Sequence, residues 1–402
     1  MNKTTEWKYL FLILIIFIAA CIETDIYLPA FADMMVAFAA TEGSIQNLLT
    51  WNFFGICLAG PLYGPLSDSY GRKRPLLIAL GIFLLGSVLT LIAQNLDQML
   101  WGRILQGLGS GGCFTLGTAI LFDAFEKRKA IDALNVLNTL IPLVMAAAPL
   151  IGGYLNNAYG FRSNFLTIAL FVAVSFFISF FFFSETLPVE KRKPLRTKDV
   201  ANDFKQALCC LPLWQLTMTI SLLFGGYIAF LSGSSLLFVV EFQVSKAIFP
   251  YFQAAILGAW VAASLFLRRA IDKWGVLQIK RAGIFLVAFG ALCLTVTSFI
   301  AGRDPWLLTM GILFYAFGAN WIIGLYFPES MEILPHIKGV VASLLTSVRL
   351  LMGALVVGLA GALYNATIFP LLAVILGSVV LMLPLLLLYE RKKKIAQNRQ
   401  EI

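Results

Sequence analysis

Charged residues are scarce in this sequence: Asp, Glu, Lys and Arg together make up 13% of its 402 residues. Soluble globular proteins carry about 25%. Apolar residues make up 60% of the chain, and the mean hydropathy is +0.87. A chain of this composition has too few polar residues to enclose its core in a water-exposed surface, which excludes a soluble enzyme.

Several signatures of enzymes and of secreted proteins are also missing. The sequence has no nucleotide-binding loop of the form G-x-x-x-x-G-K-[ST] and no plausible catalytic triad. Its six cysteines show no paired spacing, so we interpret them as small apolar side chains. No small-residue cleavage site follows the first apolar run, which predicts a retained first helix. We therefore expect neither enzymatic activity nor a metal or other cofactor.

Long apolar runs are the dominant feature of the sequence. Runs such as residues 171–183 are continuous, whereas the strands of an outer-membrane barrel alternate apolar and polar residues. Because a membrane span needs about 20 mostly apolar residues, the windows predict an all-α membrane protein with twelve transmembrane helices. The predicted spans are 8–30, 45–66, 75–94, 98–122, 130–155, 163–184, 212–240, 247–267, 279–301, 305–328, 338–364 and 367–389.

The charged stretch between the sixth and seventh windows divides the chain into two halves. We predict a six-helix bundle in 1–184, a cytoplasmic linker in 185–211, a second bundle in 212–390 and a basic cytoplasmic tail in 391–402. The segment Asp68-Ser-Tyr-Gly71 follows the second window, and Asp272-Lys-Trp-Gly275 follows the eighth. Two pseudo-symmetric halves with a site between them near the midplane are a plan typical of transporters.

The 30 Lys and Arg residues are distributed unevenly around these windows. If the N-terminus is cytoplasmic, only Arg162, Lys246 and Arg303 fall on the outer side, and Arg103 and Arg349 fall within spans. The positive-inside rule therefore predicts that both termini are cytoplasmic. The same placement accounts for the net charge of +9 without a nucleic-acid partner.

The loop after the second window carries a specific motif, Gly64-Pro-Leu-Ser-Asp68-Ser-Tyr-Gly71-Arg72-Lys-Arg74. It resembles the major facilitator superfamily signature G-x-L-x-D-x-x-G-R-K/R, which that family carries in the same loop. The resemblance implies an inner gate in which Asp68 faces Arg72. Asp123 matches the acidic position that closes a relay with this loop in the superfamily.

Further motifs resemble the Bcr/CflA drug-resistance branch of that superfamily. Residues 24–30, Thr-Asp-Ile-Tyr-Leu-Pro-Ala, are similar to its T-D-x-Y-L-P-A stretch, and residues 103–109 are similar to its R-x-x-Q-G-x-G. Residues 148–153 resemble the antiporter motif G-P-x-x-G-G, with Pro149, Gly152 and Gly153 matching. The branch implies proton-coupled export of small molecules from the bacterial cytoplasm across the inner membrane.

Two positions depart from the branch pattern. The branch usually has Gln where this chain has Arg349, and residues 328–332, Pro-Glu-Ser-Met-Glu, replace an Asn-Ala-Thr-Ala-like stretch. Arg349 has no carboxylate near it in the sequence, so we expect a cavity-facing contact with an anion, with snorkelling to the inner interface as the alternative. These departures affect the expected class of substrate.

Charges within a span are costly and mark functional positions. Glu23 and Asp25 lie two residues apart and therefore point to nearly opposite sides of the first helix. The resemblance places Arg103 opposite that helix, where we expect it to pair with Asp25. We predict that at least one carboxyl group carries the coupling proton, with a static bridge to Arg103 as the alternative.

The remaining candidate residues are polar groups near these charges. We expect substrate contacts from Tyr27 and Gln106 in the first half and from Tyr227, Ser234 and Arg349 in the second. The sequence thus predicts a monomeric, multi-pass proton/small-molecule antiporter whose partners are its substrate and the lipid bilayer. One alternative is an exporter of an endogenous anion such as a carboxylate siderophore, and another is a non-transporting membrane receptor or scaffold.

Overall fold

The computed structural model describes residues 3–125, 127–192, 197–300 and 304–400, and the regular secondary structure in these ranges is helical. The first helices are α1 (Lys3–Asp25), α2 (Phe31–Ala37), α3 (Glu42–Tyr70), α4 (Lys73–Ile92), α5 (Leu96–Ala124), α6 (Lys127–Tyr159) and α7 (Arg162–Phe182). The later helices are α8 (Thr197–Leu208), α9 (Leu211–Ser235), α10 (Phe249–Trp274), α11 (Val276–Ile300), α12 (Pro305–Met331), α13 (Lys338–Ala362) and α14 (Phe369–Gln400).

The predicted all-α membrane architecture is confirmed. Each of the twelve predicted spans corresponds to a long helix in the described part of the chain, with α2 continuing the first of them after a short break. Among the described residues, ten segments are long and apolar enough to cross a membrane by length and composition, and α3 and α6 are the other two long helices of the predicted set. The chain is therefore a multi-pass membrane protein.

Local sequence explains where two of these helices change course. The first helix ends at Asp25 instead of continuing to residue 30, because Pro29 cannot donate to an α-helical hydrogen bond and a short 3-10 turn forms at Leu28–Ala30. At the end of α9, the residues Leu236–Glu241 form a π-helix. The predicted linker 185–211 contains one helix, α8, which packs on α13 and α9.

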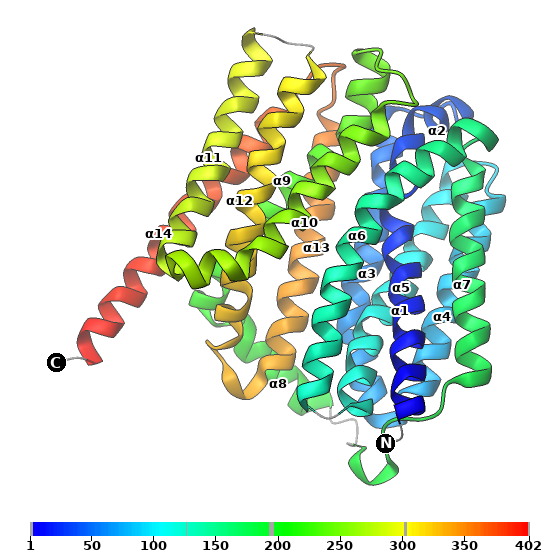
Figure 1. Ribbon diagram of the computed structural model, residues 1–402, viewed down its shortest axis with the longest axis vertical. Coiled ribbons are helices and arrows are strands. Elements are labelled where there is room, and N and C mark those ends of the chain that lie inside the picture. The colour runs from blue at the N-terminus through cyan, green and yellow to red at the C-terminus, as the bar shows by residue number, and fades with distance from the viewer. Residues whose placement is uncertain (1–2, 126, 193–196, 301–303, 401–402) are drawn as a thin grey trace. The chain divides into compact units, whose positions relative to one another are not determined.

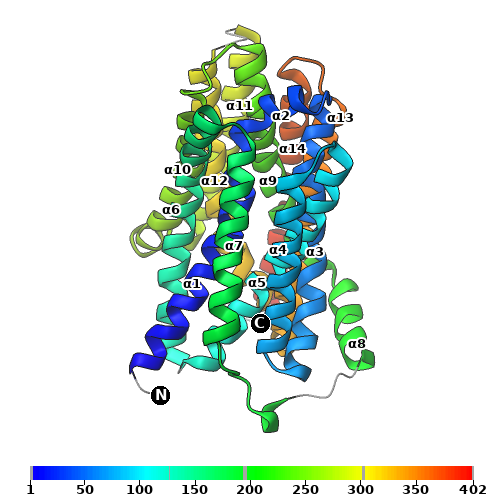
Figure 2. The ribbon, with the colours of Figure 1, turned by 90° about the vertical axis from the view of Figure 1, so that its right-hand side faces the viewer.

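The chain divides into two compact units (Figure 1). The first comprises residues 1–195 together with 238–261. Within it α5 packs against α3 and α4, and α1 packs against α5, α6 and α7, as Figure 2 shows from a second side. The segment 238–261 belongs by sequence to the second half, yet it packs with this unit.

The second unit comprises residues 196–237 and 262–402. Its central helix is α9, which packs against α12, α13 and α14, while α11 pairs with α12. The predicted basic cytoplasmic tail 391–402 stays a prediction, and α14 continues into it through Gln400. Residues 401–402 lie outside the described residues.

Candidate functional site

The first unit contains an ion pair that is completely removed from solvent. Nη1 of Arg103 on α5 lies 2.7 Å from Oε2 of Glu23 on α1, and both side chains are 0% exposed. The two helices approach closely enough for this contact because α5 is rich in glycine. A Cβ atom at Gly117 of α5, for example, would overlap the ring of Phe17 on α1.

Polar neighbours satisfy both members of this pair. Glu23 also accepts hydrogen bonds from Asn52 Nδ2 (3.1 Å) and Ser110 Oγ (3.0 Å). Arg103 donates to Oε1 of Gln106 (2.7 Å) and to the hydroxyl of Tyr27 (2.9 Å), whose ring also lies under the guanidinium. A buried ion pair is stable only when its remaining donors and acceptors are paired in this way. We call Glu23, Asn52, Arg103, Gln106, Ser110 and Tyr27 the buried network.

The expected pairing of Arg103 with Asp25 is wrong, because Glu23 takes that place. Glu23 and Tyr27 are four residues apart in sequence, and both face Arg103, whereas Asp25 lies between them on a different side of the chain. Asp25 is buried, at 2% exposure. Its Oδ2 atom has no hydrogen-bond partner among the residues the structure describes.

The predicted gate residues meet at the ends of α3, α4 and α5. Arg72 donates from Nη1 to Asp68 (2.6 Å) and to Ser67 (2.5 Å), and from Nε to Asp123 (2.6 Å). The Arg72 side chain is 9% exposed. One arginine therefore links the loop between α3 and α4 to the end of α5.

Glu185 also belongs to the cluster of charges around Arg72, and the sequence does not predict this position. Its carboxylate accepts from the backbone N–H groups of Arg72 (2.8 Å) and Leu187 (3.0 Å). Partial burial alone would raise the pKa of Glu185, but these backbone donors and the charge of Arg192 hold that pKa below its usual value. Gly71 adopts φ +88°, and a Cβ there would lie 2.9 Å from the Arg192 guanidinium, so this turn requires glycine.

The other predicted motif glycines differ in their surroundings. A Cβ at Gly152 on α6 would overlap the carbonyl of Ile26, and one at Gly153 would overlap the ring of Pro250. Pro149 is buried one turn before them on the same helix. Gly64, in contrast, has open space where its Cβ would be. Close contact with the backbone of Ile26 and with the ring of Pro250 thus explains the two glycines of α6, whereas no contact explains Gly64.

A second polar cluster in this unit escaped the sequence analysis. Asp33 on α2 pairs with Lys246 and accepts a hydrogen bond from Asn156 on α6 (2.6 Å). The cluster ties the segment 238–261 to the N-terminal helices of the unit. The sequence places Lys246 among the few outer positive charges, and sequence spacing does not reveal its partner.

Arg349 occupies a very different environment on α13 of the second unit. Its guanidinium lies 5.1 Å from the ring centroid of Phe224 on α9 and 5.9 Å from that of Phe327 on α12. It forms no ion pair within the part of the chain that the structure describes, and its buried Nε atom has no hydrogen-bond partner there. Arg349 is thus held by aromatic faces instead of a carboxylate.

The predicted polar residues of α9 lie deep in the second unit. Tyr227 is 3% exposed, and Ser234 is fully buried, donating to the carbonyl of Leu231 (2.9 Å). The hydroxyls of Ser232 and Ser235 have no hydrogen-bond partner among the described residues. The predicted substrate residues are therefore not on the outer surface of this unit.

An ionic cluster at the end of the second unit was also missed. Lys280 on α11 contacts Glu329 on α12 and Glu390 on α14, both at 2.8 Å. Lys393 contacts Glu329 (2.6 Å), and Tyr389 and Tyr326 donate to the two carboxylates. From the sequence, Glu329 is part of a departure from the branch pattern. Its pairing with Lys280 and Lys393 is not predicted there.

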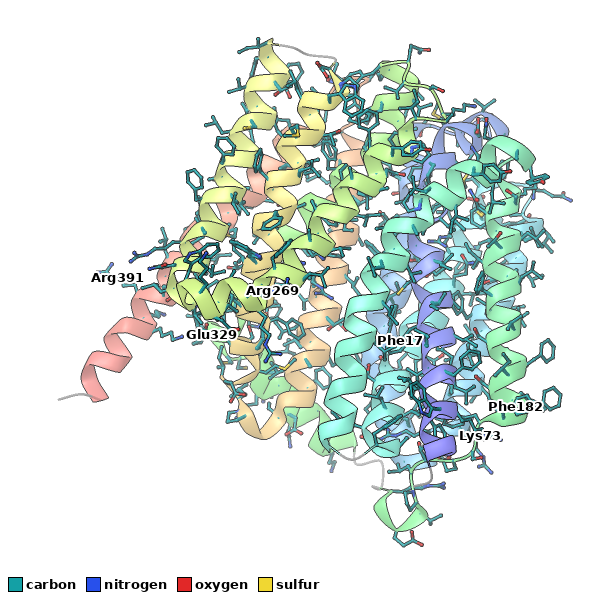
Figure 3. The ribbon with its side chains drawn as sticks, in the orientation of Figure 1. Phe17, Lys73, Phe182, Arg269, Glu329 and Arg391 are labelled. Atoms are coloured by element: carbon teal, nitrogen blue, oxygen red, sulfur yellow. The ribbon has the colours of Figure 1, made fainter. Side chains whose placement is uncertain are left out.

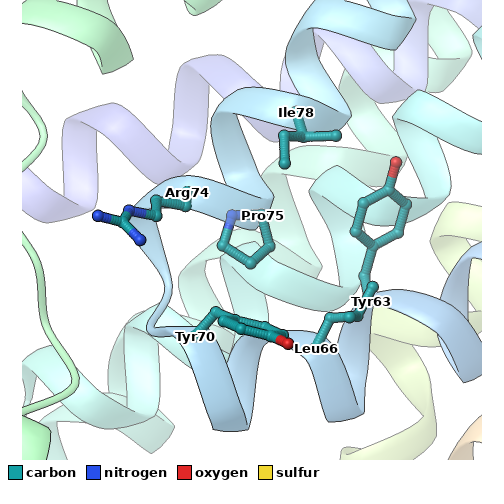
Figure 4. Close-up of a pocket in the computed structure, with 6 residues that line it drawn as sticks. All are labelled: Tyr63, Leu66, Tyr70, Arg74, Pro75 and Ile78. Carbon is teal, nitrogen blue, oxygen red and sulfur yellow. The ribbon is translucent and has the colours of Figure 1, made fainter.

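A pocket of about 290 Å³ lies beside the gate loop of the first unit (Figure 4). Its walls are mainly apolar and come from the end of α3 and the start of α4, with one cation at the rim. The lining residues are Tyr63, Leu66, Tyr70, Arg74, Pro75 and Ile78.

Charged side chains buried within spans, here Glu23, Asp25 and Arg103, are typical of membrane proteins that move solutes or ions. The family model of the Major Facilitator Superfamily matches residues 13–357, and the chain belongs to this family. It is a transporter and not an enzyme.

Relatives and solved structures agree with this assignment. The chain is 25% identical to a bicyclomycin resistance protein homolog of Haemophilus influenzae, with 87% of each chain covered. It is 26% identical to a chloramphenicol resistance protein of Pseudomonas aeruginosa, over 90% of this chain and 86% of that one. A bacterial homolog of the human lysosomal transporter Spinster shares the fold, with a TM-score of 0.71, 14% identity, and 97% and 96% coverage.

Proposed function

We propose that this transporter is a proton-coupled antiporter that exports small organic molecules across the bacterial inner membrane. The similar proteins are named for resistance to bicyclomycin and chloramphenicol, which supports export of drugs or compounds of similar size. The observation that carries the proposal is the buried network around Glu23 and Arg103 with the unpartnered oxygen of Asp25 nearby.

The two carboxyl groups have different roles in this proposal. Glu23 accepts from Arg103, Asn52 and Ser110, so its negative charge is compensated and it serves to hold Arg103. Asp25 is buried with an oxygen that no described donor satisfies. Protonation removes the cost of burying such a charge and supplies a hydroxyl donor. Asp25 is therefore our candidate for the coupling proton.

Coupling follows from competition between proton and cargo. Cargo binding beside Asp25 would require the carboxyl group to release its proton, and a new proton would return the site to its starting state. One proton moving inward gains about 2.3 kcal/mol per 100 mV. Tyr27 and Gln106 are both bound to Arg103, so cargo that contacts them would also change the position of Arg103.

The contacts of Arg72 support an inner gate. Arg72 joins Asp68 and Asp123 in one cluster, and breaking it would free the loop between α3 and α4 from α5. In this proposal the gate and both termini lie on the cytoplasmic side, and the transporter works as a monomer.

The second candidate function is export of an endogenous anion such as a carboxylate siderophore. Arg349 favours it, because this permanently charged side chain contacts Phe224 and Phe327 and has no carboxylate partner among the described residues. An arriving carboxylate would supply that partner through charge-assisted hydrogen bonds. A cationic cargo would be repelled instead.

The proton proposal is tested in vesicles that contain the purified protein and a pH-sensitive dye. Addition of chloramphenicol should drive proton movement in the wild type, and Asp25→Asn should abolish it without loss of folded protein. Asp97→Asn is the matched control, because Asp97 is exposed in the first turn of α5. Wild-type proton movement in the Asp25 variant would show that Asp25 does not carry the proton.

The cargo alternative is tested with one anion and one cation of matched size. Wild-type vesicles should move the anion faster, and Arg349→Gln should lose the anion and gain the cation. Identical selectivity of the two proteins would show that Arg349 does not contact the substrate.

A further inference from the structure

Six basic side chains are exposed at one end of the second unit. They lie on the last turns of α10, the first turns of α11 and the far part of α14. We call them the basic surface: Arg268, Arg269, Lys273, Arg281, Arg391 and Lys392. None of them forms an ion pair with a residue that the structure describes, and Asp272 is the acidic side chain exposed among them.

Internal contacts bring these three helices together. Ala270 and Ile279 share one apolar cluster, so Arg269 on α10 lies near the start of α11. Lys280 then binds Glu390 of α14 at 2.8 Å. Arg281 and Arg391 directly follow these two paired residues in the sequence. Figure 3 shows Arg269, Glu329 and Arg391 in the same region of the unit.

The same contacts leave the basic surface with uncompensated charge. Glu329 and Glu390 are engaged by Lys280 and Lys393, so two acids are neutralised by two other lysines within the cluster. Neither carboxylate is left to pair with the exposed arginines. A positive charge that the protein does not balance attracts an anionic partner.

The surface lies where membrane spans end. Both α10, which ends at Trp274, and α11, which begins at Val276, are candidate spans, and Gly275 makes the turn between them with φ +79°. Trp274 is 50% exposed and Leu277 is 58% exposed, directly beside the charges. Tryptophan next to basic residues is typical of the headgroup level of a bilayer.

We propose that the basic surface binds the headgroups of anionic phospholipids such as phosphatidylglycerol. The arginines contact the phosphate, and Trp274 and Leu277 contact the glycerol and the first acyl carbons. This apolar rim distinguishes a lipid from a soluble phosphate or a nucleic acid, because neither of those would need it. Bound lipid would hold the turn between α10 and α11 and the exit of α14 in the membrane surface.

The test uses the full chain in neutral detergent and native mass spectrometry with added lipid. Phosphatidylglycerol should bind more tightly than phosphatidylcholine with the same acyl chains. Replacement of two charges, Arg269→Gln with Arg391→Gln, should weaken phosphatidylglycerol binding about 25-fold, because each charge near an anionic surface contributes about fivefold. The thermal transition of this variant without lipid should match that of the wild type.

The matched control is Lys198→Gln with Lys205→Gln, which removes two exposed charges from α8, outside any candidate span. It should bind phosphatidylglycerol as the wild type does. An equal loss in this control, or equal binding of both lipids by the wild type, would overturn the proposal. Competition by sn-glycerol 3-phosphate at the same concentration as the lipid would also overturn it, because that result would identify a soluble phosphate site.

Discussion

Substitution of Glu23 by Gln tests whether the buried network is a structural element. The change keeps the side-chain volume but removes the carboxylate from Arg103, which has 0% exposure and no access to water. Gln also offers one acceptor oxygen where Glu23 accepts from Arg103, Asn52 and Ser110. Removing one member of a buried ion pair costs about 3–5 kcal/mol of unfolding free energy.

Two comparison variants separate this cost from other effects. Asp25→Asn breaks no ion pair in the described residues, so its effect on stability should be much smaller. The double variant Glu23→Gln with Arg103→Gln removes both charges, so it should be more stable than Glu23→Gln alone. The difference between the stability loss of the double variant and the summed losses of the two single variants gives the interaction energy of the ion pair.

The assay is equilibrium unfolding of the purified protein in mixed detergent micelles, followed in parallel with transport in vesicles. We expect Glu23→Gln to lose stability and transport together, and Asp25→Asn to lose proton-driven transport alone. Unfolding of Glu23→Gln at the wild-type midpoint would refute the reasoning, because the buried charge of Arg103 would then have found compensation elsewhere.

Three further predictions concern the corner around Arg72. Asp68→Asn should loosen the loop without releasing it, because Arg72 keeps Asp123, and a cysteine placed beside the loop should be labelled faster. Unchanged labelling with normal transport would contradict a gate at this position. The folded-state pKa of Glu185 is lowered, so its contribution is present above the ordinary glutamate pKa of about 4.3 and is lost as the pH falls through the folded-state value. The loop should therefore open as the pH falls below the ordinary glutamate pKa in a labelling experiment, and Glu185→Gln should show no such step. Gly71→Ala should destabilise the loop by about 1 kcal/mol or more, because residue 71 has a positive φ. The loss is measurable as faster proteolysis of the loop, whereas the control Gly64→Ala should be cleaved at the wild-type rate.

The fold was predictable because the bilayer restricts what a chain of this hydropathy can form. Spans must be helical and about 20 residues long, so apolar windows locate them even where Pro29 or a π-helix at Leu236–Glu241 changes the details. The linker helix α8 was not predicted, because windows that search for about 20 apolar residues do not detect a 12-residue helix rich in polar side chains.

The candidate site was predictable in its members but not in its pairing. Glu23, Asp25, Arg103 and Arg349 stand out because charges are rare within spans. Which carboxylate meets Arg103 depends on the rotation of α1 about its axis, and sequence spacing does not determine that rotation. Lys280 shows the same limit of sequence spacing. A positive charge at the inner end of a span is expected from the positive-inside rule alone, so its presence does not predict an ion pair.

The two arginines that lie within spans, Arg103 and Arg349, explain why the halves need not share a role. Arg103 has a carboxylate, an amide oxygen and a hydroxyl within hydrogen-bond distance. A ligand could therefore bind Arg103 only by displacing hydrogen-bond partners that already satisfy it. Arg349 has aromatic faces and an unpartnered Nε, so an anion would satisfy it without breaking any described hydrogen bond. Differential binding favours the unsatisfied group as the place where cargo gains free energy. The proposed division follows from this difference: the first unit holds Asp25, the candidate for the coupling proton, beside a fixed network, and the second offers the charge that selects the cargo.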